Sequence, residues 1–132
     1  MATALKPLAP KPLPAPNSDF YGIEDTLTPA EAAILEKVRG FMQTKVAPII
    51  NDYWVRDAFP FELIPELKKL GIGDLHAGGN RDRMIGMVIM EMCRVDPSFA
   101  TFFGVHAGLA MGSIVLLGSE EQKAKWLPDK IG

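Results

Sequence analysis

Apolar residues recur every three or four positions in the first half of the chain, which is the spacing of one helix face. Between residues 30 and 54 they are Ile34, Leu35, Val38, Phe41, Met42, Val46, Ile49, Ile50, Tyr53 and Trp54. Thr28 suits an N-cap, Pro29 suits the first helical position, and Glu31 can close a capping box. We therefore predict a first helix from Thr28, where ordered structure begins, that is kinked or interrupted at Pro48.

Two further helices are predicted in the middle of the chain. Residues 61–70 are predicted to form a short one, in which Pro65 favours a start near Ile64 and Gly71 lies at the C-terminal end. Residues 74–83 are polar and rich in glycine, which indicates a loop. Residues 84–95 are apolar on almost every side, so we expect a helix that is buried on several faces.

The fourth predicted helix, residues 98–117, contains no ionised side chain. Asp96 and Pro97 end the preceding helix and open this one, and glycine recurs every fourth residue at Gly104, Gly108 and Gly112. No segment shows the period-two alternation of a strand. The predicted fold class is therefore all-α, a small helical bundle.

This uncharged segment also raises the question of a membrane span. Its length of about 20 residues is enough to cross a bilayer, and spaced glycines pack transmembrane helices. Against this, the flanks carry no aromatic belt, and Thr101, His106 and Ser113 lower the hydrophobicity. The neighbouring helices also have apolar faces that need a partner. We expect the central helix of a soluble bundle, and a small membrane protein spanning at residues 98–117 is the alternative.

Proline dominates residues 6–16, which read K-P-L-A-P-K-P-L-P-A-P. Proline fixes φ and removes backbone donors, so helix and sheet are excluded and an extended, polyproline-like arm is expected. We interpret residues 1–23 as a disordered, solvated arm. A ligand for a proline-recognising groove is the alternative interpretation.

Composition narrows the class of protein. The chain has 132 residues, 48% of them hydrophobic and 23% charged, as expected for one globular domain. The net charge of −2 gives no electrostatic reason to expect a nucleic-acid partner or an anionic membrane surface. The single cysteine, Cys93, excludes an internal disulfide, and its apolar neighbours predict a buried side chain. A reducing intracellular compartment is expected, with cytoplasm and peroxisome not distinguished.

The most informative motif is residues 118–128, which read G-S-E-E-Q-K-A-K-W-L-P. Ser119 is a good N-cap, Gln122 can complete a capping box, and Pro128 marks the helix end. This wording resembles the acyl-CoA dehydrogenase and acyl-CoA oxidase superfamily, in which a G-[ST]-E-x-Q-K-x-K-[YW]-L-P segment closes the N-terminal helical domain.

Other segments carry the same resemblance. Residues 91–98 match an E-x-x-R-x-D-x-S segment. Residues 27–41, which begin L-T-P-A-E and end in F, are similar to a family pattern that begins L-T-x-E and ends in F, with the glutamate one position later here. The V-A-P kink at residues 46–48 and Phe59-Pro60 also fit. The resemblance covers residues 24–128, and the wording is nearest to the glutaryl-CoA dehydrogenase or short-chain acyl-CoA oxidase branch.

The resemblance implies an FAD-dependent oxidoreductase that oxidises the Cα–Cβ bond of acyl-CoA thioesters. Its members have a helical N-terminal domain, a β-domain and a C-terminal helical domain, and they assemble as homodimers or homotetramers. The resemblance also implies that Thr101, Phe102, Val105 and Leu109 face the acyl cavity and bind substrate. Ordinary core packing is the alternative for each of them.

The chain departs from the family pattern in two ways. It has no counterpart of the T-E-P-x-x-G-S-D or W-[IL]-[TS] flavin segments and no catalytic glutamate, so we expect residues 24–132 to be an N-terminal domain or fragment without activity of its own. No residue is assigned to catalysis, to cofactor binding or to a metal. The loop at residues 75–83 is also shorter than the usual glycine-rich loop.

Four polar residues are candidates for a chemical role, and each also has a structural interpretation. His106 could be a base or a metal ligand, but a packed or hydrogen-bonded histidine is favoured. Glu91 more readily pairs with Arg94 or with a neighbouring helix than acts in catalysis. Arg94 and Asp96 are interpreted as structural pins at a helix corner. The alternative function for the whole chain is a non-catalytic helical interaction module.

Overall fold

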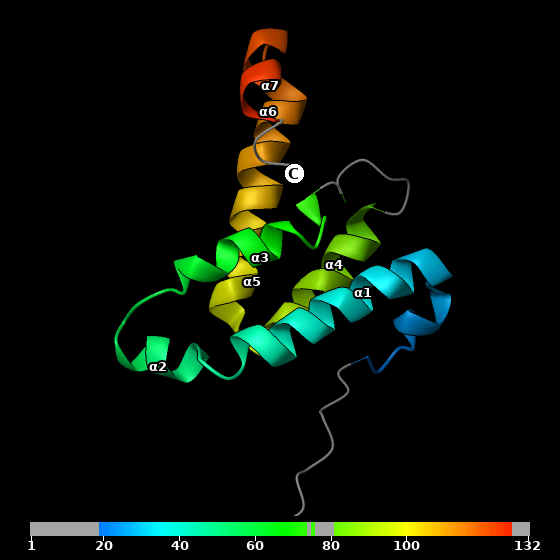
Figure 1. Ribbon diagram of the computed structural model, residues 1–132. Helices are drawn as coiled ribbons and strands as arrows, with labels where there is room; N and C mark the ends of the chain where they lie inside the picture. The colour runs from blue at the N-terminus through cyan, green and yellow to red at the C-terminus, as the bar shows by residue number, and fades with distance from the viewer. Residues whose placement is uncertain (1–18, 74, 76–80, 128–132) are drawn as a thin grey trace, which may run out of the picture.

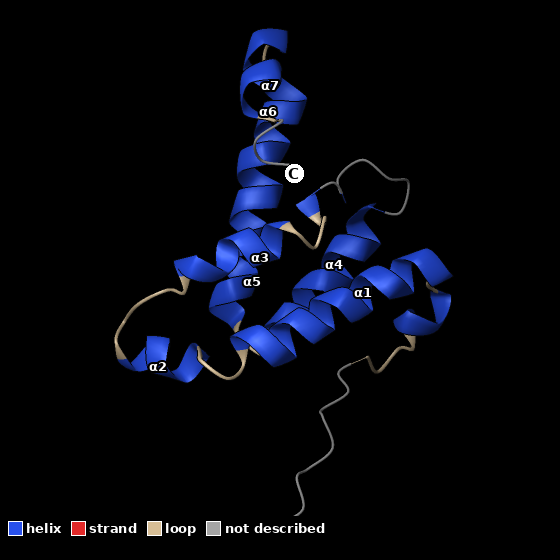
Figure 2. Ribbon diagram, viewed as in Figure 1, coloured by secondary structure: helices blue, strands red, loops and turns tan. Residues whose placement is uncertain are grey.

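The computed structural model describes residues 19–73, 75 and 81–127, and every regular element in that part of the chain is helical (Figures 1 and 2). This confirms the all-α prediction. In chain order the elements are η1 (Ile23–Thr26), α1 (Pro29–Phe41), η2 (Met42–Val46), α2 (Ile50–Val55), η3 (Phe61–Leu63), α3 (Ile64–Lys68), α4 (Arg81–Cys93), α5 (Pro97–Phe103), η5 (Gly104–Met111), α6 (Gly112–Leu117) and α7 (Glu120–Trp126). The elements η1 and η3 are 3-10 turns, whereas η2 and η5 are π-helical.

The first helix begins where its capping box predicts. The Thr28 hydroxyl accepts a hydrogen bond from the Glu31 backbone N–H at 3.3 Å, and the Glu31 carboxylate accepts one from the Thr28 N–H at 2.8 Å. Ordered structure nevertheless starts before Thr28, so that part of the prediction was wrong. The Asp19 carboxylate accepts hydrogen bonds from the N–H groups of Ile23 and Glu24 and thereby fixes η1. The rest of the predicted arm, residues 1–18, lies outside the described residues.

The interruption predicted at Pro48 is present, and it is preceded by a change of helix type. Through η2 the backbone widens, and the N–H of Ala47 donates to the carbonyl of Met42, five residues back, at 2.8 Å. Proline cannot donate the next hydrogen bond, and α2 resumes only at Ile50. The π turn therefore carries the chain from α1 past the proline.

The middle helices match their predicted positions with two corrections. Helix α3 has Pro65 in its first turn, and the chain turns away at Gly71, whose φ of 65° favours glycine. Helix α4 begins at Arg81, so the predicted loop ends earlier than residue 83. Cys93 is exposed, not buried, because its neighbour Met92 takes the core position at the end of α4. Residues 74 and 76–80 of that predicted loop lie outside the described part.

The core lies where α1, α4 and α5 pack together (Figure 1). Phe99, at the start of α5, is fully buried, and its ring lies 5.9 Å from that of Phe41 and 5.4 Å from that of Phe59. The other fully buried side chains of the cluster are Val38, Met42, Val46, Val88 and Met92. The apolar face of the first predicted helix and buried residues of the third therefore belong to one core cluster with Phe99.

The long apolar segment α5–η5–α6 is only partly a core helix. Its first half packs into the bundle, whereas α6 extends beyond it and α7 folds back beside α6 (Figure 1). Leu109, Leu116 and Leu117 are exposed by 68%, 72% and 87%. The prediction of a central buried helix thus holds for α5 and fails for α6, whose side chains stay largely exposed although α7 packs beside it.

The same segment is the one helix among the described residues that is long and apolar enough to cross a membrane. It runs from Pro97 to Leu117, and 28% of its most apolar stretch is buried in the protein.

Candidate functional site

Three of the four predicted substrate residues form one exposed stripe on the long helix. We call Thr101, Val105 and Leu109 the ridge; they lie four positions apart, and all three are exposed. Val105 is half exposed and Leu109 more so. The Thr101 hydroxyl donates to the Pro97 carbonyl at 2.9 Å, so its hydrogen-bonding capacity is directed to its own helix. The ridge is therefore an uncharged, mainly apolar surface.

Phe102, the fourth predicted substrate residue, turns towards the core. Its ring centroid lies 5.0 Å from that of Phe59 and 6.5 Å from that of Phe99. On its other side the ring of His106 stacks nearly parallel to it, at a centroid distance of 6.0 Å. Phe102 thus borders the ridge but belongs to the aromatic cluster, and His106 is a packed histidine in keeping with its interpretation.

Two of the three ridge residues lie on a π-helical stretch, a feature that the sequence did not predict. Val105 and Leu109 both fall within η5. Short π segments are uncommon and often occur at functional sites, because the wider turn changes which side chains share a face. Of the three glycines in the stripe, Gly104 is approached by the Ile89 side chain of α4, whereas a side chain at Gly108 or Gly112 would meet nothing within 4 Å. Another helix therefore comes close to the stripe at one of its three glycines.

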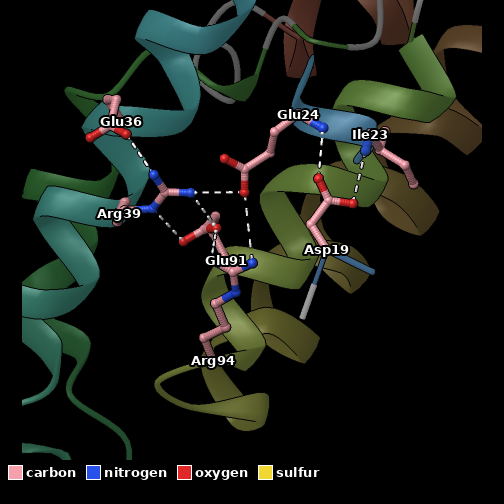
Figure 3. Close-up of polar contacts among 7 residues, drawn as sticks. All are labelled: Asp19, Ile23, Glu24, Glu36, Arg39, Glu91 and Arg94. Carbon is pink, nitrogen blue, oxygen red and sulfur yellow. Dashed lines mark hydrogen bonds and ion pairs between the residues drawn. The ribbon is translucent and has the colours of Figure 1, made fainter. Parts of the chain in front are cut away.

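A charged cluster joins α1 to α4 on the side shown in Figure 3. The Arg39 guanidinium donates two hydrogen bonds to Glu91, from Nε at 3.1 Å and from Nη2 at 2.9 Å. It also pairs with Glu24 at 3.0 Å and Glu36 at 2.5 Å, and Arg94 pairs with Glu91 at 2.6 Å. The hydrogen bonds to Glu91 raise the pKa of Arg39 above its ordinary value. Glu91 therefore has both predicted partners and a structural role.

A second polar contact fixes the corner before α5. Asp96 is almost fully buried, and its carboxylate accepts hydrogen bonds from the Phe99 N–H at 2.7 Å and from the Trp54 indole N–H at 2.6 Å. Asp96 is thus the N-cap of α5 and also ties α2 to this corner. The predicted structural pin is confirmed, and its indole partner was not foreseen.

A third contact holds the start of α1 against α4. Arg83 donates to Glu31 at 2.8 Å. Hydrogen bonding, first from the Thr28 N–H and then from Arg83, lowers the pKa of Glu31 to about 2. Nε of Arg83 is buried and has no hydrogen-bond partner among the described residues.

The pockets beside α7 and beside α2 do not have the lining of a flavin site. Among the described residues, one pocket of about 300 Å³ lies between α6 and α7, and another of about 620 Å³ lies beside α2. Neither is lined by ridge residues or by a set of donors suited to phosphates, and Nε of Arg83 is the sole unsatisfied buried side-chain polar atom described. No group of three acidic, histidine or cysteine side chains within the described ranges could hold a metal ion.

Comparison with known proteins agrees with this architecture. A family model described as "Acyl-CoA dehydrogenase, N-terminal domain" matches residues 28–131. An acyl-CoA dehydrogenase of Bacillus subtilis (strain 168) is 27% identical over 78% of this chain and 29% of its own length. The mitochondrial isobutyryl-CoA dehydrogenase of Dictyostelium discoideum is 28% identical over 69% of the chain and 23% of its own length.

A probable acyl-CoA dehydrogenase of Bacillus subtilis (strain 168) is 30% identical over 83% of this chain and 19% of its own length. The chain thus spans less than a third of each of these relatives. None of these matches selects the glutaryl-CoA dehydrogenase or short-chain oxidase branch. Because the family model covers most of the chain and the helices follow its pattern, the chain belongs to the acyl-CoA dehydrogenase family, as an N-terminal α-helical domain.

Proposed function

We propose that this chain supplies one wall of the acyl pocket in an FAD-dependent acyl-CoA dehydrogenase or oxidase. The ridge of Thr101, Val105 and Leu109 contacts the acyl chain, and Phe102 supports it from the aromatic cluster. The surrounding face of η5 and α6 receives the β-domain of a homodimeric or homotetrameric protein. The single observation that supports the proposal best is an exposed, charge-free helix face in a domain of this family.

The chemistry of the ridge suits a hydrocarbon ligand. An acyl chain is bound by an apolar slot from which water is excluded, and aliphatic side chains supply such a slot without competing hydrogen bonds. Val105 and Leu109 expose 50% and 68% of their surface, so either an acyl chain or another domain can cover them. Each side chain of that size stabilises the covered state by about 1.5–3 kcal/mol when it is fully buried.

We expect the flavin to be bound by parts of the full-length protein outside these residues. In members of the family FAD accepts the hydride from the acyl group, and the described residues offer no donor set for it. We therefore expect the purified chain to catalyse no acyl-CoA oxidation. Turnover by the chain alone would contradict this assignment.

A segment exchange tests the proposal. In the Bacillus subtilis acyl-CoA dehydrogenase, the aligned segment is replaced by residues 28–127 of this chain, and FAD content and acyl-CoA-dependent reduction of an acceptor dye are measured. We expect a protein that binds FAD and reduces the dye only with an acyl-CoA. A folded, FAD-containing hybrid that is inactive with acyl-CoAs of every length would refute the proposal.

A substitution within the hybrid tests the ridge. Leu109→Trp fills the space beside the ridge, so kcat/KM for the longest accepted acyl-CoA should fall about tenfold, or ~1.4 kcal/mol, while short substrates are less affected. Val55→Trp is the control, because Val55 is also an exposed aliphatic residue, at 87% against 68% for Leu109, and lies on α2. Equal losses in the two variants, or no dependence on acyl length, would remove the ridge from the substrate site.

A further inference from the structure

The larger pocket, beside α2, lies outside the ridge and has aromatic walls. Its volume is about 620 Å³, and we call it the α2 pocket. It is lined by Ile50, Trp54, Asp57, Ala58, Phe59, Phe61 and Ser98. Trp54 and Phe61 leave 61% and 66% of their surface exposed. Two large aromatic side chains that stay exposed around one hollow are a mark of a binding surface.

The walls of the α2 pocket are held in place before any ligand arrives. The Trp54 indole N–H is bonded to the buried Asp96, which orients the ring and leaves its face for contact. Phe59 packs edge-on against Phe61 at a centroid distance of 5.1 Å and stacks on Phe99 at 5.4 Å. Because its side chains are already fixed, such a pocket loses little conformational entropy when a ligand binds.

The charge of the α2 pocket favours a cationic ligand. Asp57 is the ionisable residue among its described lining residues. Its backbone has φ of 52°, an uncommon conformation for a residue other than glycine, and its N–H donates to the Trp54 carbonyl at 3.1 Å. The strained turn therefore places a carboxylate at the edge of the aromatic walls.

One segment of this chain has the matching chemistry. Residues 6–16 contain two K-P-L units, at residues 6–8 and 11–13, within a run of closely spaced prolines. Proline-rich segments bind to aromatic-lined grooves because their extended form costs little entropy and their rings pack on aromatic faces. Each K-P-L unit also carries a lysine that can pair with an acidic residue at the rim.

The distance along the chain permits the contact. Lys6 lies 13 positions before Asp19, the first described residue, and a chain in the polyproline form extends about 3.1 Å per residue, or roughly 40 Å in all. A domain of this size has a radius of gyration of about 13 Å. Tethering also gives an effective concentration of order millimolar, so a weak contact suffices. We propose that residues 6–16 dock within the same molecule onto the α2 pocket.

The experiment measures the fluorescence of Trp54 in the full chain. The protein has two tryptophans, so Trp126→Phe leaves Trp54 alone. Acrylamide quenching of Trp54 is then compared with and without replacement of Pro7, Pro10, Pro12 and Pro14 by alanine. We expect quenching to increase about twofold in the alanine variant, because the ring loses its cover. Synthetic peptide 6–16 at millimolar concentration should reverse the increase.

Matched controls separate docking from other effects. With Trp54→Phe, the same proline substitutions should leave quenching of Trp126 on α7 unchanged. Phe61→Ala should abolish the protection by the peptide, whereas Leu116→Ala on α6, where the side chain is 72% exposed against 66% for Phe61, should not. Circular dichroism verifies that each variant is folded.

Three results would overturn the proposal. They are unchanged quenching of Trp54 when the prolines are removed, an equal change at Trp126, and failure of the peptide to protect Trp54. Protection of Trp54 that weakens on tenfold dilution of the protein would assign the occupant to a second copy, and that too would overturn docking within one molecule.

Discussion

The contact between Arg39 and Glu91 gives the most stringent test of how the bundle is held together. Glu91 is 2% exposed, and the Arg39 guanidinium binds both of its carboxylate oxygens. We predict that Arg39→Gln destabilises the domain strongly, because a buried carboxylate then loses its bidentate partner on the neighbouring helix. Arg94 remains beside Glu91 at 2.6 Å and limits the loss.

The expected loss of stability follows from the burial of the Glu91 carboxylate. Removal of one partner from a buried ion pair costs about 3–5 kcal/mol, because the remaining charge is desolvated and unpaired. With Arg94 still in place, we expect the lower end, about 3 kcal/mol. For a domain of roughly 100 residues each kcal/mol shifts Tm by about 4–8 °C, so Tm should fall by about 12 °C or more.

The matched control is a substitution at Glu36, a different partner of the Arg39 guanidinium. Glu36 pairs with Arg39 at 2.5 Å, but its side chain is 67% exposed, so Glu36→Gln should cost less than about 1 kcal/mol. Urea unfolding followed by circular dichroism measures both variants. Equal losses for Arg39→Gln and Glu36→Gln would show that the buried contact contributes no more than a surface pair, and the reasoning would fail.

Three further predictions follow from single residues. Thr28→Ala removes the N-cap of α1 and should lower the free energy of unfolding by about 1 kcal/mol in the same urea assay; no change would mean that the cap is redundant. The folded-state pKa of Glu31 is lowered from 4.5 to about 2, so its stabilising effect is complete above about pH 4.5 and is lost as the pH falls towards 2. Glu31→Gln should therefore flatten the acid-side decline in Tm, and an unaltered decline would contradict the assignment. Cys93 is exposed, so a thiol reagent should modify it in the native protein without denaturant, and protection until unfolding would show the side chain to be buried.

Local signals in the sequence were sufficient to place most helix ends. The capping boxes of Thr28 with Glu31 and of Ser119 with Gln122 are both present, as is the start of α5 at Pro97. Each of these devices depends on partners within three or four residues, so spacing alone identifies it. The apolar periodicity of the first helix likewise identified Val38 and Phe41 as core residues.

Features that depend on packing between distant segments were harder to predict from the sequence. Arg39 and Glu91 are 52 residues apart, and Trp54 and Asp96 are 42 apart, so no local sequence pattern predicts either hydrogen bond. Whether Cys93 is exposed depends on which face of α4 packs against α1. Because α4 is apolar on nearly every side, its sequence does not define that face. The π turn η5 was also missed, because ordinary helical spacing does not indicate such a turn.

The central claim is that the ridge is covered in the assembled flavoprotein and open in this chain. Leu109→Cys in a Cys93→Ser background reports on this directly through its rate of reaction with a maleimide. The account predicts fast labelling in the chain alone and labelling slower by about tenfold or more in the Bacillus hybrid, slower still with a long acyl-CoA. Asn51→Cys on exposed α2 serves as the reference and should react equally in both. Equal rates at position 109 in the chain and in an active hybrid would contradict the claim.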